Sequence, residues 1–139
     1  MPPITRRFIK TGLVYFVLAM IAGILVAARP VFHLPTPAGA LTPIYFHLFM
    51  VGWVLQLIMG IAYWMFPKYS RERPRGYNGL MWTAYGLLNL GLVLRVIAEP
   101  MATLQERPLW GWLLVVSAVS QWLAALAFTA NMWPRVKEK

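Results

Sequence analysis

Four long apolar runs alternate with short polar segments along the chain. The runs cover about residues 8–28, 41–66, 79–98 and 109–133. A helix rises about 1.5 Å per residue, so a run of about 20 residues can cross a bilayer core about 30 Å thick. The pattern predicts an all-α integral membrane protein, a four-helix bundle in which residues 1–139 form a single four-span domain.

The segments between the runs carry helix-breaking residues. We expect a loop over residues 29–39, which contain three prolines: Pro30, Pro35 and Pro37. Pro100 is expected to close the third span. A basic start before an apolar run is also typical of a signal peptide, but the first run is longer than the apolar part of such a peptide, so we expect a retained span.

Positive charge gathers at one set of run ends. The chain has 13 Lys and Arg against four acidic residues, for a net charge of +9, and only 12% of its residues are charged. Ten of these cations lie in the N-terminal head, the second loop and the C-terminal tail: Arg6, Arg7, Lys10, Lys68, Arg71, Arg73, Arg75, Arg135, Lys137 and Lys139. The positive-inside rule then predicts that both termini are cytoplasmic, in a multi-pass protein of the bacterial inner membrane. A nucleic-acid patch is the less favoured interpretation of the basic second loop.

The chain has no cysteine. This excludes disulfides, thiolate metal sites and haem attachment through Cys, and it leaves His33 and His47 as the only strong nitrogen ligands for a metal. His33 lies in the Pro-rich segment, where a solvated side chain is the ordinary interpretation. His47 lies about six residues, or roughly 9 Å, into the second run. An ionisable side chain at that depth is costly to bury, so His47 is a candidate functional residue.

Two arginines are expected in the same outer leaflet as His47. Arg29 closes the first span, and Arg95 lies a few residues before the end of the third, both nearer the outer surface than His47. Imidazole is a good axial ligand for haem iron, and a guanidinium can grip a haem propionate with two hydrogen bonds. The ordinary alternatives are an ion pair between Arg95 and Glu99, extension of Arg29 to the headgroups, and a hydrogen bond from His47 to a neighbouring polar group.

Small and polar residues accompany His47 along the second run. Gly52 and Gly60 lie on a strip beside the His47 face. They leave room for a flat macrocycle, but they serve plain helix packing equally well. Gln56 projects to the opposite side and, like Asn89 in the third run, can form a hydrogen bond to another helix.

The second run, HLFMVGWVLQLIMGIAYWMFP, resembles the second transmembrane helix of catalytic subunit I in the haem–copper oxidase and nitric oxide reductase superfamily. It is most similar to the short four-span relatives of that subunit. The shared pattern is a His, a Gly-Trp pair, Gly-x-x-Tyr and a closing Phe-Pro, here His47, Gly52, Trp53, Gly60, Tyr63, Phe66 and Pro67. The stretch NLGLVLR, residues 89–95, also looks like the third helix of those relatives.

The resemblance implies a b-type haem with His47 as an axial ligand near the outer side. The third and fourth runs contain no His for a copper site. One chain is therefore not expected to be a complete oxidase, and whether it is an enzyme stays open. The second axial ligand could be His33, a symmetry-related His47 or a His on another subunit. We therefore expect a homo-oligomer or a subunit of a larger membrane complex.

Three functions follow from these expectations. The leading one is electron transfer, or the role of a small haem-containing subunit, in a respiratory or other redox complex. The alternative is a non-haem accessory or assembly subunit that packs against larger membrane partners. A self-contained enzyme or sensor, for quinol or nitric oxide, is the third. Membrane lipid is an expected partner and nucleic acid is not.

Overall fold

The computed structural model describes residues 1–33 and 39–136. Its helical elements are α1 (Pro3–Phe32), α2 (Leu41–Phe46), η2 (His47–Leu55), α3 (Gln56–Met65), α4 (Asn78–Leu104), α5 (Pro108–Met132) and the 3₁₀ turn η3 (Trp133–Arg135). Elements α2, η2 and α3 form one uninterrupted helix, so the described residues contain four helices long and apolar enough to cross a membrane. The prediction of an all-α chain with four candidate spans is confirmed.

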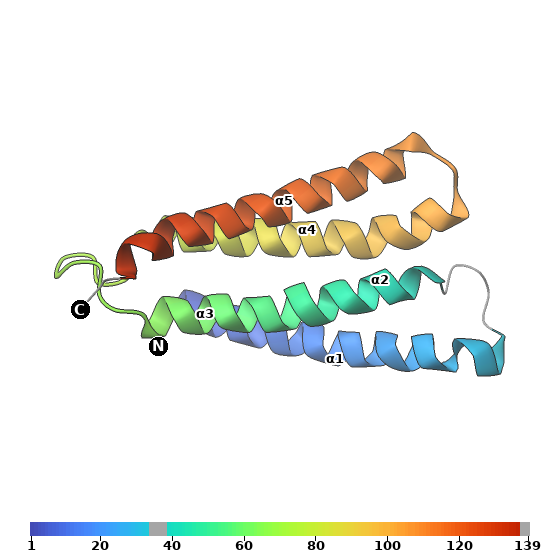
Figure 1. Ribbon diagram of the computed structural model, residues 1–139, viewed down its shortest axis with the longest axis horizontal. Coiled ribbons are helices and arrows are strands. Elements are labelled where there is room, and N and C mark those ends of the chain that lie inside the picture. Colours follow the sequence, from blue (N-terminus) through green and yellow to red (C-terminus); the bar gives the residue numbers. More distant parts are fainter. Residues whose placement is uncertain (34–38, 137–139) are drawn as a thin grey trace.

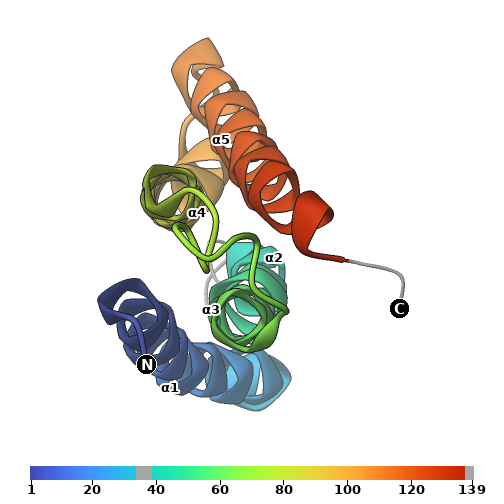
Figure 2. The same cartoon turned by 90° about the vertical axis from the view of Figure 1, so that its left-hand side faces the viewer.

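The helices pair into two hairpins (Figure 1). α1 packs along α2, η2 and α3, and α4 packs along α5. The hairpins meet where α4 contacts α2, η2 and α1. The end-on view in Figure 2 shows α1 and α5 on opposite outer sides, so the first and last helices do not close a ring. The start of α1 and the end of α5 lie at the same end of the molecule (Figure 1).

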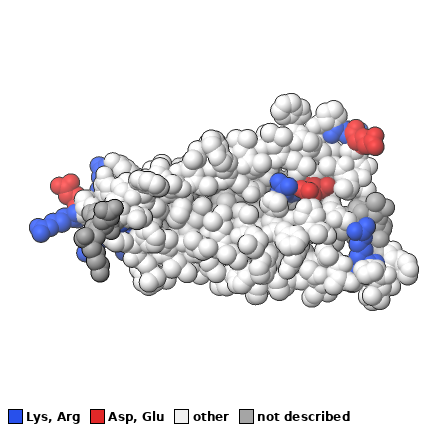
Figure 3. Space-filling view, in the orientation of Figure 1, with Lys and Arg blue, Asp and Glu red and all other residues white. Residues whose placement is uncertain are grey.

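Apolar side chains both hold the helices together and cover their outside. The larger buried cluster draws on all four helices: Ile4, Phe8, Met59, Tyr63, Met81, Leu88, Ala124 and Met132. The outer faces expose large apolar side chains such as Ile24, Val93 and Trp122. Figure 3 shows charged side chains near both ends of one face and a mostly uncharged band between them. This apolar exterior suits lipid rather than water, and the four helices indicate a multi-pass membrane protein.

α1 is longer at both ends than the sequence pattern predicted. It starts at Pro3 rather than at residue 8. Proline has no backbone N–H, but an N–H in the first turn of a helix would have no partner within the helix, so no hydrogen bond is lost there. It also continues through Pro30 to Phe32, so the prediction of a loop that begins at Arg29 was wrong. The helix lasts only two residues beyond Pro30, and the next N–H, that of His33, reaches the carbonyl oxygen of Arg29. Pro35 and Pro37 lie outside the described residues.

α4 likewise continues through Pro100 and ends at Leu104 rather than at residue 98. One further turn forms because the backbone N–H of Gln105 reaches the carbonyl oxygen of Met101, 2.9 Å away. A proline this close to a helix end removes one hydrogen bond without ending the helix. The second and fourth spans begin and end within one residue of their predicted bounds.

Arg135 joins the end of α5 to the end of α3. Its side chain is only 1% exposed. The guanidinium donates hydrogen bonds to the backbone carbonyl oxygens of Tyr63, Phe66 and Pro67, at 3.0, 2.7 and 3.0 Å. Carbonyls at a helix C-terminus have no partner within the helix, so Arg135 supplies the donors that they lack. The sequence pattern places Arg135 only among the cations of the basic C-terminal tail, and it does not predict this burial.

Candidate functional site

His47 begins the π-helical segment η2 in the middle of the second span. Its Nδ1 lies 2.9 Å from the carbonyl oxygen of Pro43, one turn earlier. A carbonyl oxygen only accepts hydrogen bonds, so Nδ1 must carry the proton and Nε2 of the neutral ring keeps its lone pair. Metal-ligating histidines commonly have this arrangement, in which one ring nitrogen donates to a carbonyl and the other faces the metal.

The segment η2 covers His47–Leu55. A π-helix bonds each N–H to the carbonyl five residues back, which is wider than an α-helix, rare, and frequent at functional sites. The change from the α-helix α2 to the π-helix η2 therefore occurs at His47. No signal in the sequence distinguished this segment from an ordinary apolar helix, since none of its residues breaks a helix.

The face of the second span that carries His47 is only partly covered. Four residues share this face, and two of them, Met50 and Ile58, are 53% and 54% exposed. The other two, Val51 and Val54, are partly buried, as is His47. The opposite side, with Gln56 fully buried, packs into the molecule. A group bound at His47 would therefore lie at the outside of a single chain.

Arg95 lies at the level of His47. Its neighbour Val96 packs against a small buried cluster that contains Ile44 and Leu48 from the second span. Because α4 extends to Leu104, Arg95 is not nearer than His47 to the end of the molecule where α2 begins, which differs from the expectation.

Arg95 also has a partner within the chain. Its Nε lies 3.2 Å from Oε2 of Glu99, one turn later, in an ion pair whose alignment falls short of a hydrogen bond. The alternative of an ion pair between Arg95 and Glu99, one helical turn apart, is therefore present in the structure. Nε is the guanidinium atom that faces the carboxylate.

Arg29 lies closer to the end of the molecule than Arg95 does. It is exposed in the last turn of α1, and with Val26, Pro30 and Thr42 it lines a hollow of about 410 Å³. Thr42 is in the first turn of α2, so the guanidinium lies beside the start of the helix that carries His47. The two arginines therefore reach the second span at two different levels.

His33 is the C-terminal cap of α1, exposed and in a left-handed conformation with φ of 51°. Its role as a second axial ligand stays a prediction. Among the described residues, no group of three or more His, Asp or Glu side chains is placed to hold a metal ion. A haem iron brings four nitrogen ligands of its own and needs only one or two from the protein, so the single free Nε2 of His47 fits a haem better than a bare metal ion.

Gly52 and Gly60 both serve helix packing. A Cβ at Gly52 would lie 2.9 Å from Cβ and Cγ of Tyr15, and one at Gly60 would lie 2.8 Å from Cβ of Phe8. Both distances are shorter than carbon–carbon van der Waals contact, so α1 occupies the space that these glycines leave. Of the two roles considered for them, the structure supports close approach of α1 rather than room for a macrocycle.

A partly buried chain of polar groups links α3, α4 and α1 on the far side of the second span. Nε2 of Gln56 donates to Oδ1 of Asn89 at 3.2 Å, and Nδ2 of Asn89 donates to the carbonyl oxygen of Tyr85 at 2.8 Å. The hydroxyl of Tyr85 lies 2.8 Å from Oγ1 of Thr11 in α1. The expectation that Gln56 and Asn89 bond to other helices is confirmed, and they bond to each other.

Searches of family models, curated proteins and solved structures find no match for this chain.

Proposed function

We propose that this chain binds a b-type haem through Nε2 of His47 and transfers electrons in the bacterial inner membrane. The observation that carries the proposal is the bond between Nδ1 of His47 and the Pro43 carbonyl, because it fixes the tautomer that leaves Nε2 free. The resemblance of the second span to haem–copper oxidase subunit I supports the same assignment. Haem supplies one-electron redox chemistry when it is bound.

The chain's own residues would then hold and orient the haem. His47 is the axial ligand, and its hydrogen bond to Pro43 keeps the ring from turning. Arg29, which is exposed beside the start of α2, is the residue best placed to pair with a propionate. Arg95 keeps its pairing with Glu99, so the charges of these two side chains offset each other.

The open face around His47 supports an assembly of more than one chain. A haem in lipid with one face uncovered would lack a second axial ligand. A second copy whose His47 face meets the first would supply that ligand and cover the exposed Met50 and Ile58. We therefore propose a homo-oligomer, or a subunit of a larger redox complex, with the haem between chains. Both termini are proposed to be cytoplasmic, because ten of the 13 cations lie in the segments at that end of the spans.

The test is a reduced-minus-oxidised visible spectrum with haem quantitation, on protein produced with haem supplied. The wild type should show sharp b-type bands, and His47→Ala should lose them while it keeps its helical content. His33→Ala is the matched control, since it removes the other imidazole. A colourless wild type would overturn the proposal and favour an accessory subunit that packs against larger partners.

A further inference from the structure

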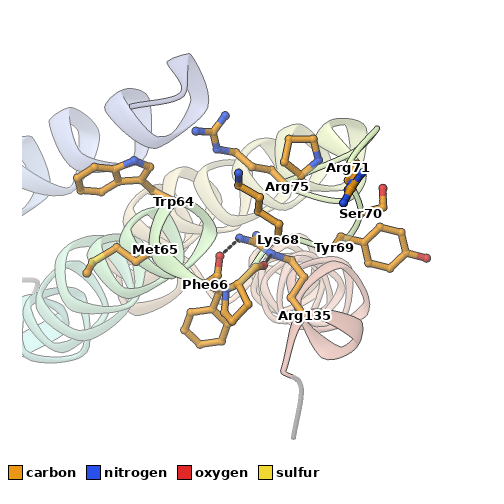
Figure 4. A pocket seen from close by; sticks show the side chains of 11 residues that line it. Trp64, Met65, Phe66, Lys68, Tyr69, Ser70, Arg71, Arg75 and Arg135 are labelled. Atoms are coloured by element: carbon orange, nitrogen blue, oxygen red, sulfur yellow. Dashed lines mark hydrogen bonds between the residues drawn. The ribbon is translucent and has the colours of Figure 1, made fainter. Parts of the chain in front are cut away.

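A basic hollow lies at the end of the molecule where α3 and α5 finish. It has a volume of about 900 Å³ and is bounded by the end of α3, the loop that follows it and the end of α5. Four cations line it, Lys68, Arg71, Arg75 and Arg135. Figure 4 shows Lys68 beside Arg135, Arg75 on the far side of Lys68, and Trp64 and Met65 on the α3 side. This hollow is far from His47, which lies toward the opposite end of the same span.

Within residues 1–33 and 39–136, no carboxylate pairs with the positive charge of this hollow. Among the described residues the one ion pair joins Arg95 and Glu99, in another part of the chain. Glu72, the acidic residue of this loop, does not line the hollow. Arg135 is buried, and its hydrogen bonds go to uncharged groups, three backbone carbonyl oxygens and Sδ of Met132. The net field therefore favours an anion, and Lys and Arg are the side chains that bind phosphate.

The loop that carries these cations is held in shape before any ligand arrives. The backbone N–H of Tyr69 reaches the carbonyl oxygen of Pro74 at 3.0 Å, which brings the flanking Lys68 and Arg75 toward each other. The side chain of Asn131, which is buried in α5, accepts a hydrogen bond from the backbone N–H of Tyr77 at 2.7 Å. A binding site that is ordered in advance loses less entropy when its ligand binds.

An apolar wall adjoins the cations. Trp64, Met65 and Phe66, in the last turn and cap of α3, are all exposed. Since α3 is the end of a candidate membrane span, these side chains lie where acyl chains meet headgroups. A soluble anion would use only the cations, whereas a phospholipid would use both the cations and the apolar wall.

We propose that this hollow binds one anionic phospholipid, with its phosphate between Lys68 and Arg75 and its acyl chains along Trp64 and Met65. The proposal does not rest on haem binding. It assigns a recognition role to the second loop, whose charge was first interpreted only as a signal of topology.

Native mass spectrometry of the detergent-solubilised chain tests this site. Phosphatidylglycerol and phosphatidylcholine with the same acyl chains would be added in turn. We expect one phosphatidylglycerol to be retained per chain, and Lys68→Gln and Arg75→Gln each to weaken its binding about fivefold. Circular dichroism would check that both variants keep their helices.

Arg6→Gln is the matched control, because Arg6 is exposed at the same end of the molecule and outside this hollow. It should leave retention unchanged. Equal retention of the two lipids, or equal weakening by Arg6→Gln, would overturn the proposal in favour of diffuse attraction. Displacement of the lipid by millimolar inorganic phosphate would also overturn it, by showing a site for soluble anions.

Discussion

Arg135 is a buried cation that forms no ion pair with any acid in the part of the chain that the structure describes. A buried charge of this kind is tolerated when it is fully hydrogen-bonded, and here three backbone carbonyls accept from it. The guanidinium also lies 5.6 Å from the centroid of the Tyr63 ring. One side chain therefore fixes where α3 ends and holds the two hairpins together at that end.

Replacing Arg135 by Met should destabilise the fold, because Met fills a similar space but leaves the three carbonyls without donors. We expect a loss of roughly 2–4 kcal/mol, since each buried unpaired polar group costs about 1–3 kcal/mol. The thermal unfolding midpoint in detergent measures it. Arg107→Met, at an exposed site, is the control and should leave the midpoint unchanged. Equal midpoints for both variants would contradict the bridging role.

At the scale of the element, glycines decide how closely the helices approach. In the first hairpin, Gly60 lets the backbone of the second span reach Phe8 of α1. In the second, a Cβ at Gly91 would lie 2.8 Å from the carbonyl oxygen of Ser117, and Oγ of Ser117 donates to the carbonyl oxygen of Gly91 at 2.6 Å. Close approach through small residues is a main source of helix association in lipid.

Gly60→Ala should therefore lower the unfolding midpoint, by an amount equivalent to about 1–3 kcal/mol of overpacking. Gly86→Ala is the matched control, because Gly86 is also in a helix interior and nothing lies within 4 Å of its added Cβ. That variant should be neutral or slightly more stable, since Ala favours helix over Gly. If both variants shifted the midpoint alike, helix propensity rather than packing would govern these positions.

The four spans could be predicted because an apolar run of spanning length is visible in the residues themselves. The true ends of α1 and α4 could not, because Pro30 and Pro100 are tolerated only through hydrogen bonds that the structure shows. His47 was visible as an ionisable group in an apolar run. A hydrogen bond from His47 to a neighbouring polar group was one of the alternatives considered, and the structure shows it to the carbonyl oxygen of Pro43. The burial of Arg135 depends on contacts with α3, far away in the sequence, and no local pattern signals it.

At the scale of the whole molecule, the His47 face is partly open while the opposite face is packed. The proposed haem would therefore lie between chains, with His47 of each as a ligand. We predict one haem for every two chains, measured by haem and protein quantitation on the intact oligomer. His33→Ala should keep this ratio, since His33 is exposed at the end of α1. One haem per chain, lost in His33→Ala, would instead place both ligands on one chain.

The central claim is that the imidazole of His47 ligates the haem iron. The most direct measurement is the reduced-minus-oxidised spectrum of His47→Gly, recorded with and without added imidazole. We predict that the b-type bands are lost in this variant and return when free imidazole occupies the vacated space. Unchanged bands in His47→Gly without imidazole would contradict the claim, because the iron would then be held by another residue.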